Sequence, residues 1–357
     1  MRPGPSTDAL AGAVAVGARV EVVRGREVLA VDVPAWGVVL EETSGRTVPA
    51  QLSFMAPLSW VPTHPLSPLA NFGQRVHVTS LMECGGVRVE VELGWYQVDD
   101  WAEQDSGVQV TALDLLAIPD GTDLVWPSSP EAGATILSEL RRMAAPLPVV
   151  LDDPVDRAVP RTTQWGVKRV ENIRDLCASY GLEYGVQPDG YLHAWATRDG
   201  RRPVAHYSAI DVGAPGTRAG RLLSAPRKAQ PRRANRVTVV GTTGSGDDEQ
   251  RWSATVTATQ PPFDEAGYGV VQERYEMSQA TSQHQVDEAA QTYMRDALVT
   301  TETRSWEIPA DPRLQRGDII SATTGTGETL IGRIVAYSLP VSEPGDKERV
   351  DVEVLQW

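Results

Sequence analysis

The stretch Ile173–Leu192 reads IRDLCASYGLEYGVQPDGYL, and its pattern predicts a helix followed by a β-hairpin. Apolar side chains recur at helical spacing at Ile173, Leu176, Cys177 and Tyr180. Gly181 suits the left-handed position that ends many helices, because glycine has no Cβ to clash there. Pro188-Asp189-Gly190 then supplies a turn, with a fixed φ, a local hydrogen-bonding side chain and a permitted positive φ in that order. The sequence therefore predicts a helix over 168–180 and strands over 182–186 and 191–196.

Two further helices are predicted on either side of this stretch. Residues 130–145, PEAGATILSELRRMAA, place Pro130 at a first-turn position and their apolar residues on one face. Together with the helix and hairpin they predict a small α+β unit in the middle of the chain. Residues 282–299 predict one more helix, with Ser282 as its N-cap.

The rest of the chain alternates apolar and polar residues over short runs, which predicts strands. In the first part these runs are a hairpin over 19–33 and strands over 76–80, 87–93, 95–98 and 108–113. In the last part they are 236–240, 252–259, 303–308, 319–323, 330–339 and 349–355. The predicted fold class is mainly β with an α+β insert, and the strand spacing of the first part resembles a small barrel or sandwich.

Composition excludes several classes of protein. The net charge of −14 over 357 residues argues against a dedicated reader of duplex DNA, which needs a basic face to neutralise phosphates. Two cysteines, Cys84 and Cys177, cannot build a disulfide framework or a multi-cysteine zinc site. No apolar run reaches the ~20 residues that span a bilayer. Residues 11–18, AGAVAVGA, are interpreted as an ordinary N-terminal arm rather than a secretory signal.

The residues that commonly carry chemistry form no catalytic pattern. Five histidines are scattered without metal-ligand spacing, at His64, His77, His193, His206 and His284. Cys177 lies on the apolar face of its helix, Cys84 precedes a Gly-Gly turn, and the acidic run 152–156 lacks the spacing of a calcium loop. The Gly-rich runs 241–246 and 324–327 lack the Lys-Ser/Thr of a phosphate loop. We therefore predict no catalytic, cofactor-binding or metal-binding residues, no cofactor and no enzyme activity.

One charge anomaly remains in the sequence. The stretch Arg218–Arg236 holds seven basic residues and no acidic ones. Contact with nucleic acid is one interpretation, but no aromatic residues interleave for base stacking, which favours a solvated linker or contact with acidic protein surfaces. Residues 241–250, GTTGSGDDEQ, predict a mobile polar loop. Trp36, Trp60 and Trp126 could anchor an interface or belong to the core.

The last two-thirds of the chain resemble the tail hub proteins of long-tailed bacteriophages. That family includes the baseplate hub of contractile tails and the minor tail proteins of actinobacterial phages. Three features in this order carry the resemblance: the helix and hairpin of Ile173–Leu192, the helix 286–299, and the motif P-x-L-x-x-G-D-x-I within Pro309–Ile320.

The resemblance implies two tube-like β-barrel domains flanking a small α+β domain, with boundaries at 1–122, 123–215 and 216–357. Three copies would then present six barrels in a pseudo-sixfold ring. The implied function is a structural virion protein, a homotrimeric tail-tip hub that joins the tail tube to the tip and lets DNA pass. Such a hub would be made in the host cytoplasm, and Gly317 in its motif is expected to be needed for assembly.

Implied partners are two further copies, the distal tail and tube proteins, the tape-measure protein and other tail-tip proteins, with DNA only in transit. The alternative is a carbohydrate-binding or glycan-degrading multi-domain β protein. A third hypothesis is an unrelated enzyme whose site is assembled only by the fold.

Overall fold

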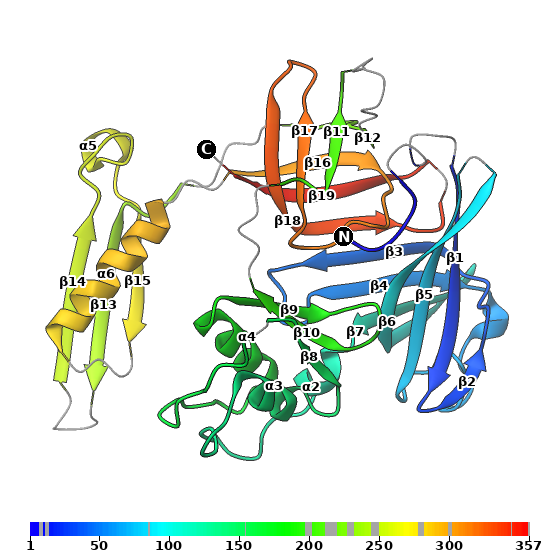
Figure 1. The fold of residues 1–357 in the computed structure, drawn as a ribbon, viewed down its shortest axis with the longest axis horizontal. Helices are drawn as coiled ribbons and strands as arrows, with labels where there is room; N and C mark the ends of the chain where they lie inside the picture. Colours follow the sequence, from blue (N-terminus) through cyan, green and yellow to red (C-terminus); the bar gives the residue numbers. More distant parts are fainter. Residues whose placement is uncertain are drawn as a thin grey trace. The chain divides into compact units, whose positions relative to one another are not determined.

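The computed structural model describes residues 1–6, 10, 14–84, 86–153, 155–196, 202–210, 220–226, 232–243, 250–277, 282–298, 302–343 and 345–355. The chain forms two compact units (Figure 1): unit 1 is Met1–Pro226 with Arg304–Trp357, and unit 2 is Arg227–Thr303. The predicted loop 241–250 and the basic stretch 218–236 lie partly outside the described residues. The boundaries at 1–122, 123–215 and 216–357 stay a prediction about domains that fold on their own.

The fold is mostly β, as predicted. The strands before the helical region are β1 (Val14–Arg24), β2 (Glu27–Ala30), β3 (Trp36–Thr43), β4 (Ala50–Ala56), β5 (Gln74–Cys84), β6 (Val87–Gln104) and β7 (Gly107–Asp114). The later strands of unit 1 are β11 (Ala205–Ser208), β12 (Gly220–Arg221), β16 (Glu302–Pro309), β17 (Ile319–Thr323), β18 (Thr329–Pro340) and β19 (Lys347–Val354). A short 3-10 turn, η1 (Leu58–Trp60), follows β4.

These thirteen strands form one sheet rather than two separate ones. Its main path runs β12-β11-β17-β18-β3-β4-β7-β6-β5-β1-β2, with β19 and β16 branching from β18. The join is made by β18, whose first residues pair with β17 and whose last residues pair with β3, with Leu339 opposite Leu40. Two tube-like barrels are not confirmed: the described strands form no closed barrel, because β18 continues the sheet into β3.

A single hydrophobic core underlies both ends of this sheet. Strand β4 alternates buried and half-buried residues, so that Leu52 and Phe54 face inward. The same core contains Trp306 of β16, which is fully buried, and Leu339 of β18. The first and last parts of the chain are therefore packed as one body within unit 1.

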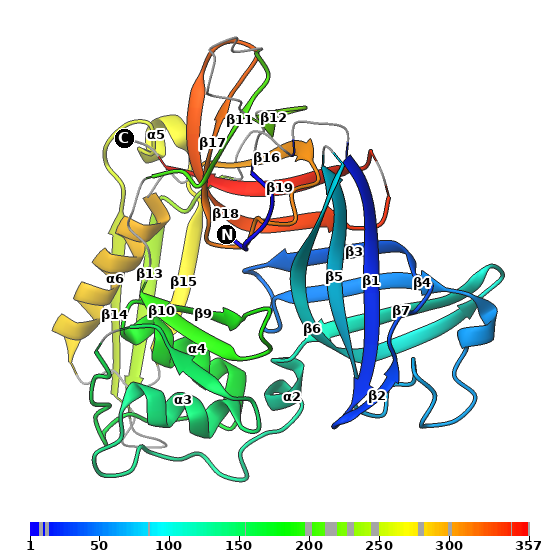
Figure 2. The same ribbon diagram turned by 45° about the vertical axis from the view of Figure 1, so that its right-hand side comes forward.

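Strand β6 merges two strands that the sequence predicts separately, 87–93 and 95–98. Gly94 has φ +128° and lies where the pairing between β5 and β6 shifts register. The bulge lets the strand bend and continue, which is typical of such irregularities. Figure 2 shows β1, β5 and β6 as long strands lying side by side.

The middle of unit 1 is the predicted α+β region with its own core. It contains α2 (Ala117–Asp120), α3 (Ile136–Ala144), α4 (Arg169–Ser179) and the sheet β8 (Val149–Leu151), β10 (Leu192–Ala196), β9 (Leu182–Val186). Helix α4 and the β9–β10 hairpin confirm the prediction from Ile173–Leu192, and Gly181 has φ +66°. The predicted helix over 130–145 is wrong at its start: Gly133 has φ +78°, and Thr135 caps a helix that begins at Ile136.

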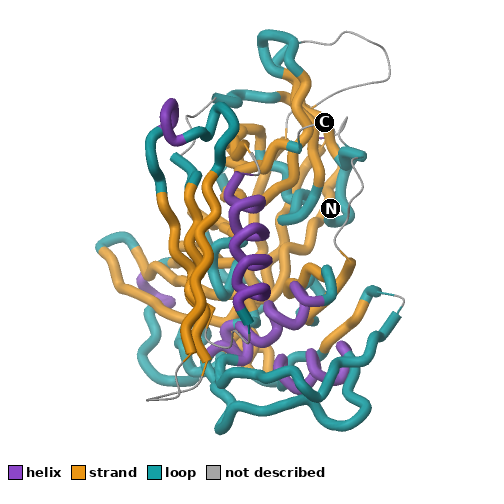
Figure 3. The backbone as a smooth tube through the Cα atoms, turned by 90° about the vertical axis from the view of Figure 1, so that its left-hand side faces the viewer, coloured by secondary structure: helices purple, strands orange, loops and turns teal. Residues whose placement is uncertain are grey.

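Unit 2 is a three-stranded sheet packed against one helix. Strands β14 (Gln250–Thr257), β13 (Arg236–Thr243) and β15 (Gln272–Met277) form the sheet, and a short helix, α5 (Glu265–Tyr268), precedes β15. Helix α6 (Gln283–Leu298) runs alongside these strands (Figure 3), with Val286 and Ala290 buried against Val237 and Val239. The sequence missed β15, because QERYEM has too few apolar residues to show a strand pattern.

Candidate functional site

The motif segment 309–318, PADPRLQRGD, carries a polar network in which Asp311 and Arg313 are buried. Arg313 donates to both carboxylate oxygens of Asp311, at 2.8 and 2.7 Å. Tyr207 donates to the same carboxylate at 2.8 Å, and Glu348 accepts the backbone N–H of Asp311 at 2.7 Å. Burial, reinforced by the charge of Asp311, raises the pKa of Glu348 well above its usual value.

The first residues of the chain are bound into this network through a second arginine. Arg2 donates to the carbonyls of Pro312 and Leu314, at 3.1 and 2.6 Å, and Arg313 donates in return to the carbonyl of Pro5 at 2.7 Å. Gly4 passes so close to Arg313 that an added Cβ would lie 2.7 Å from Cγ of that arginine. No local pattern in the sequence pointed to this reciprocal contact, because the two arginines lie more than 300 residues apart.

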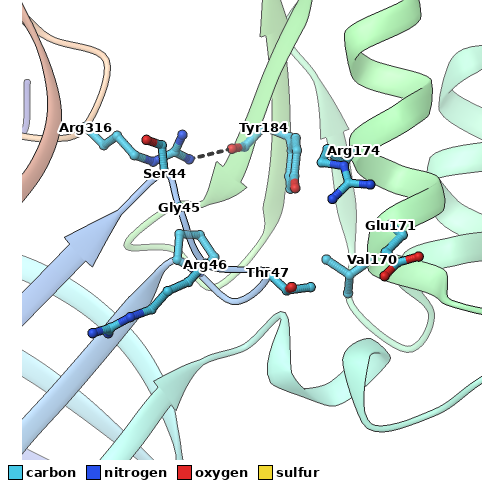
Figure 4. Close-up of a pocket in the computed structure, with 10 residues that line it drawn as sticks. Ser44, Gly45, Arg46, Thr47, Val170, Glu171, Arg174, Tyr184 and Arg316 are labelled. Carbon is cyan, nitrogen blue, oxygen red and sulfur yellow. Dashed lines mark hydrogen bonds between the residues drawn. The ribbon is translucent and has the colours of Figure 1, made fainter. Parts of the chain in front are cut away.

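Arg316 connects the motif segment to the α+β region. Its Nε donates to Glu42 of β3 at 2.9 Å, and its Nη2 donates to the carbonyl of Tyr184 in β9 at 2.9 Å (Figure 4). Tyr337 of β18 donates to the other oxygen of Glu42 at 2.9 Å and accepts from Arg2 at 3.1 Å. Burial alone would lower the pKa of Arg316, but Glu42 outweighs burial and the pKa is raised. One chain of charged bonds therefore joins β3, β18, β9 and the N-terminal segment.

Asp114 lies where the large sheet passes into the α+β region. Its carboxylate accepts the backbone N–H groups of Ala50 at 3.1 Å and Leu116 at 2.7 Å. Burial raises the pKa of Asp114 to about 7, even though both hydrogen bonds favour the ionised form.

Two hollows border Arg316. The first, of about 210 Å³, lies between the turn after β3 and the first half of α4 (Figure 4). In this view Arg174 points between Tyr184 and Glu171, whereas Arg46 points away from them, so the three arginines do not converge on one anion position. The second hollow, of about 590 Å³, is lined by both sides of the β9–β10 hairpin and by residues 315–318.

The five histidines that the sequence showed without metal-ligand spacing have ordinary partners in the structure, apart from His193. His77 lies 3.1 Å from Glu21, and its ring stacks on Trp95 with centroids 4.5 Å apart. His206 contacts Ser321 at 2.8 Å, and His64 accepts the N–H of Leu66 at 3.2 Å. His284 lies 3.6 Å from Glu288 on an exposed face of α6. His193 is bound between Asp152 and Asp189, at 2.8 and 3.0 Å.

The cysteines, the acidic run and the Gly-rich run 324–327 were the other candidate sites in the sequence. Cys177 is buried, and burial raises the pKa of its thiol to about 12, whereas the side chain of Cys84 lies outside the described residues. In the acidic run, Asp156 accepts the N–H of Leu137 in the first turn of α3 at 3.0 Å. Residues 324–327 form the turn between β17 and β18. No group of three His, Cys, Asp or Glu side chains in the described part of the chain is placed to hold a metal ion.

The structure also shows the surroundings of Gly317 and of two of the tryptophans singled out in the sequence. Gly317 has φ +84°, and an added Cβ would lie 2.9 Å from a carboxylate oxygen of Glu183. Trp60 packs against the large core, whereas Trp126 is 77% exposed. None of the described helices is both long and apolar enough to cross a membrane. The geometry of the motif segment can fix the positions of strands, but it presents no activated nucleophile.

The fold is found in phage tail proteins. Similar structures include the tail protein from Neisseria meningitidis MC58 (TM-score 0.62, 13% identity, 94% of this chain and 96% of that chain). The 43 kDa tail protein of prophage MuSo2 from Shewanella oneidensis has a TM-score of 0.58 and 12% identity, with 94% and 98% covered. Prophage tail protein gp18 from Listeria monocytogenes EGD-e has a TM-score of 0.51 and 10% identity, with 94% of each chain covered.

The sequence supports the same assignment over the middle and later part of the chain. Residues 171–337 match the family model described as "Putative phage tail protein". None of the curated proteins matches the chain. The family match over residues 171–337 and the shared fold agree with the resemblance to phage tail and baseplate proteins drawn from the sequence.

Proposed function

We propose that this chain is a structural, non-enzymatic component of the virion, a tail-tip hub that forms a homotrimer and joins the tail tube to the tip. Three copies would place six β regions around one axis, which is the number that a pseudo-sixfold ring needs. Each copy contributes its first and last β regions as the equivalents of the two expected barrels, and DNA passes through the centre. Distal tail and tube proteins, the tape-measure protein and other tip proteins are its partners in this role.

The observation that carries the proposal is the pairing of β18 with β3. Because this join and the shared core make one body of both β regions, their relative geometry is fixed within each copy. A ring that imitates sixfold symmetry with three copies needs that fixed geometry, since each copy must supply two correctly spaced parts. The net charge of −14 agrees with a passage that repels DNA rather than binding it.

Mass in solution and end-on images test the proposal. Native mass spectrometry and sedimentation of the full chain should show three copies of the 38.7 kDa chain, about 116 kDa, at high protein concentration. Electron-microscopy averages of that particle, viewed along its axis, should show six β lobes around a central opening. A dimer, a tetramer or a trimer with only three lobes would contradict the hub, and so would a chain that stays monomeric at every concentration and with its tail partners present.

A further inference from the structure

His193 lies between two carboxylates that belong to different elements. It occupies the second position of β10, opposite Val150 of β8 and Gly185 of β9. Its Nδ1 is 2.8 Å from Asp152, just after β8, and its Nε2 is 3.0 Å from Asp189 in the β9–β10 turn. An ionised carboxylate only accepts hydrogen bonds, and a neutral imidazole donates from only one nitrogen. Both bonds can therefore form only when the ring carries two protons.

Asp189 also accepts a hydrogen bond from the backbone of the turn. One of its oxygens faces His193, and the other accepts the backbone N–H of Tyr191 at 3.0 Å. The turn itself is closed by the N–H of Gly190, which donates to the carbonyl of Gln187 at 2.8 Å. Asp152 is held at its own end, because its N–H donates to the carbonyl of Ala194 at 2.8 Å. The ring thus ties the turn to the end of β8.

Other charged groups line the same hollow, and each has an ion-pair partner of its own. Glu183 of β9 pairs with Arg333 at 3.4 Å, and Arg316 pairs with Glu42 at 2.9 Å. Asp318 pairs with the amino group of Met1 at 2.7 Å. The carboxylates within hydrogen-bonding distance of His193 are those of Asp152 and Asp189.

These two aspartates set the protonation of the ring. Burial lowers the pKa of His193, but the hydrogen bonds and charges of the two aspartates outweigh burial, so the pKa is raised above 6.5. The ring is 16% exposed, so protons can exchange with solvent.

We propose that His193 is a proton-dependent latch that holds the 187–190 turn against the end of β8. When the ring loses a proton, one nitrogen becomes an acceptor that faces a carboxylate, and attraction gives way to repulsion. Because the pKa is raised in the folded state, the latch is fully closed below the ordinary histidine value and opens as the pH rises through the folded value. Opening frees one wall of the 590 Å³ hollow, which Trp195 and Gln187 also line.

Hydrogen exchange of the full chain, followed by mass spectrometry between about pH 6 and pH 9, tests the latch. After correction for intrinsic exchange, the amides of residues 187 and 189–191 should exchange about tenfold faster above the transition than below it. His193→Gln and Asp189→Asn should abolish this step. His206→Gln is the matched control and should keep it, because His206 contacts Ser321 rather than a carboxylate.

Nuclear magnetic resonance of the wild-type chain gives a test that needs no variant. Two-bond ¹H–¹⁵N spectra should show both ring nitrogens of His193 protonated at about pH 6, with a midpoint above the ordinary value of about 6.5. A single neutral tautomer at that pH would overturn the latch. A step in exchange that persists in a folded His193→Gln variant, verified by its thermal unfolding, would overturn it too. Neither readout depends on the oligomeric state.

Discussion

Substituting Gly317 measures how tightly the motif segment is fitted against the α+β region. Gly317 has φ +84°, where a side chain costs about 1–2 kcal/mol of conformational strain. An alanine Cβ would also lie 2.9 Å from a carboxylate oxygen of Glu183, which is closer than real Cβ atoms approach other atoms. Glu183 would have to move from Arg333, its ion-pair partner at 3.4 Å, which adds up to about 1 kcal/mol because the pair is partly exposed. We expect Gly317→Ala to destabilise unit 1 by about 1–3 kcal/mol in total.

Gly327 offers a matched control within the same unit. It also has φ +84°, but no atom lies within 4 Å of the position of an added Cβ. Gly327→Ala should therefore cost only the conformational strain, about 1–2 kcal/mol. Urea unfolding followed by tryptophan fluorescence compares the two, because every tryptophan except Trp252 falls within the residue ranges of unit 1. Equal losses for both variants would refute the fitted contact with Glu183.

Three further predictions follow from the charged junction and the core. Arg316→Met and Glu42→Gln should show a coupling of about 1–3 kcal/mol in a double-mutant cycle of unfolding free energies, and a coupling near zero would mean that solvent screens the pair. Asp114→Asn should flatten the pH dependence of the unfolding free energy. Burial raises the pKa of Asp114 in the folded chain to about 7, so between about pH 4 and pH 7 the folded chain keeps a proton that the unfolded chain releases. The unfolding free energy of the wild type should therefore fall by up to about 4 kcal/mol as the pH rises over this range. Thermal unfolding of the wild type and of Asp114→Asn at about pH 5 and pH 8 checks this, and an equal change in stability between the two pH values for both proteins would contradict it. The Cys177 thiol, with its pKa raised to about 12 by burial, should resist iodoacetamide until urea unfolds the chain, as peptide mass spectrometry can show; rapid labelling of the native chain would contradict its burial.

Local signals in the sequence were sufficient for the helices and the hairpin near Ile173–Leu192. A left-handed glycine and an apolar helical face act over a few residues, so they can be recognised without the rest of the fold. Gly317 was expected from its motif to be needed for assembly, and φ +84° supplies a physical reason why a side chain is disfavoured there. The start of α3 was misjudged because Pro130 suggested a first turn, whereas Thr135 provides the cap.

The joined sheet could not be predicted from these signals. Pairing of β18 with β3 brings together residues about 300 positions apart, and their register follows from packing in three dimensions. The reciprocal contacts of Arg2 and Arg313 have the same origin, since an arginine in a Pro-Gly-rich segment has no local feature that identifies its partner. Strand β15 pairs in parallel with β13, so no short hairpin turn marked it in the sequence.

The partly buried charges of the junction explain why the two β regions keep one relative position. Apolar contacts alone tolerate small shifts, because hydrophobic burial has no direction. The bonds from Arg316 to Glu42 and to the carbonyl of Tyr184 are different, since a shift of about 1 Å would leave partly buried charges without partners. A buried ion pair adds little net stability compared with a well-packed apolar contact, but it penalises alternative arrangements strongly. In the proposed hub this penalty would keep each copy from distorting when neighbouring subunits and the tail tube press on it, so Arg316→Met should impair the regularity of the ring more than the folding of the isolated chain.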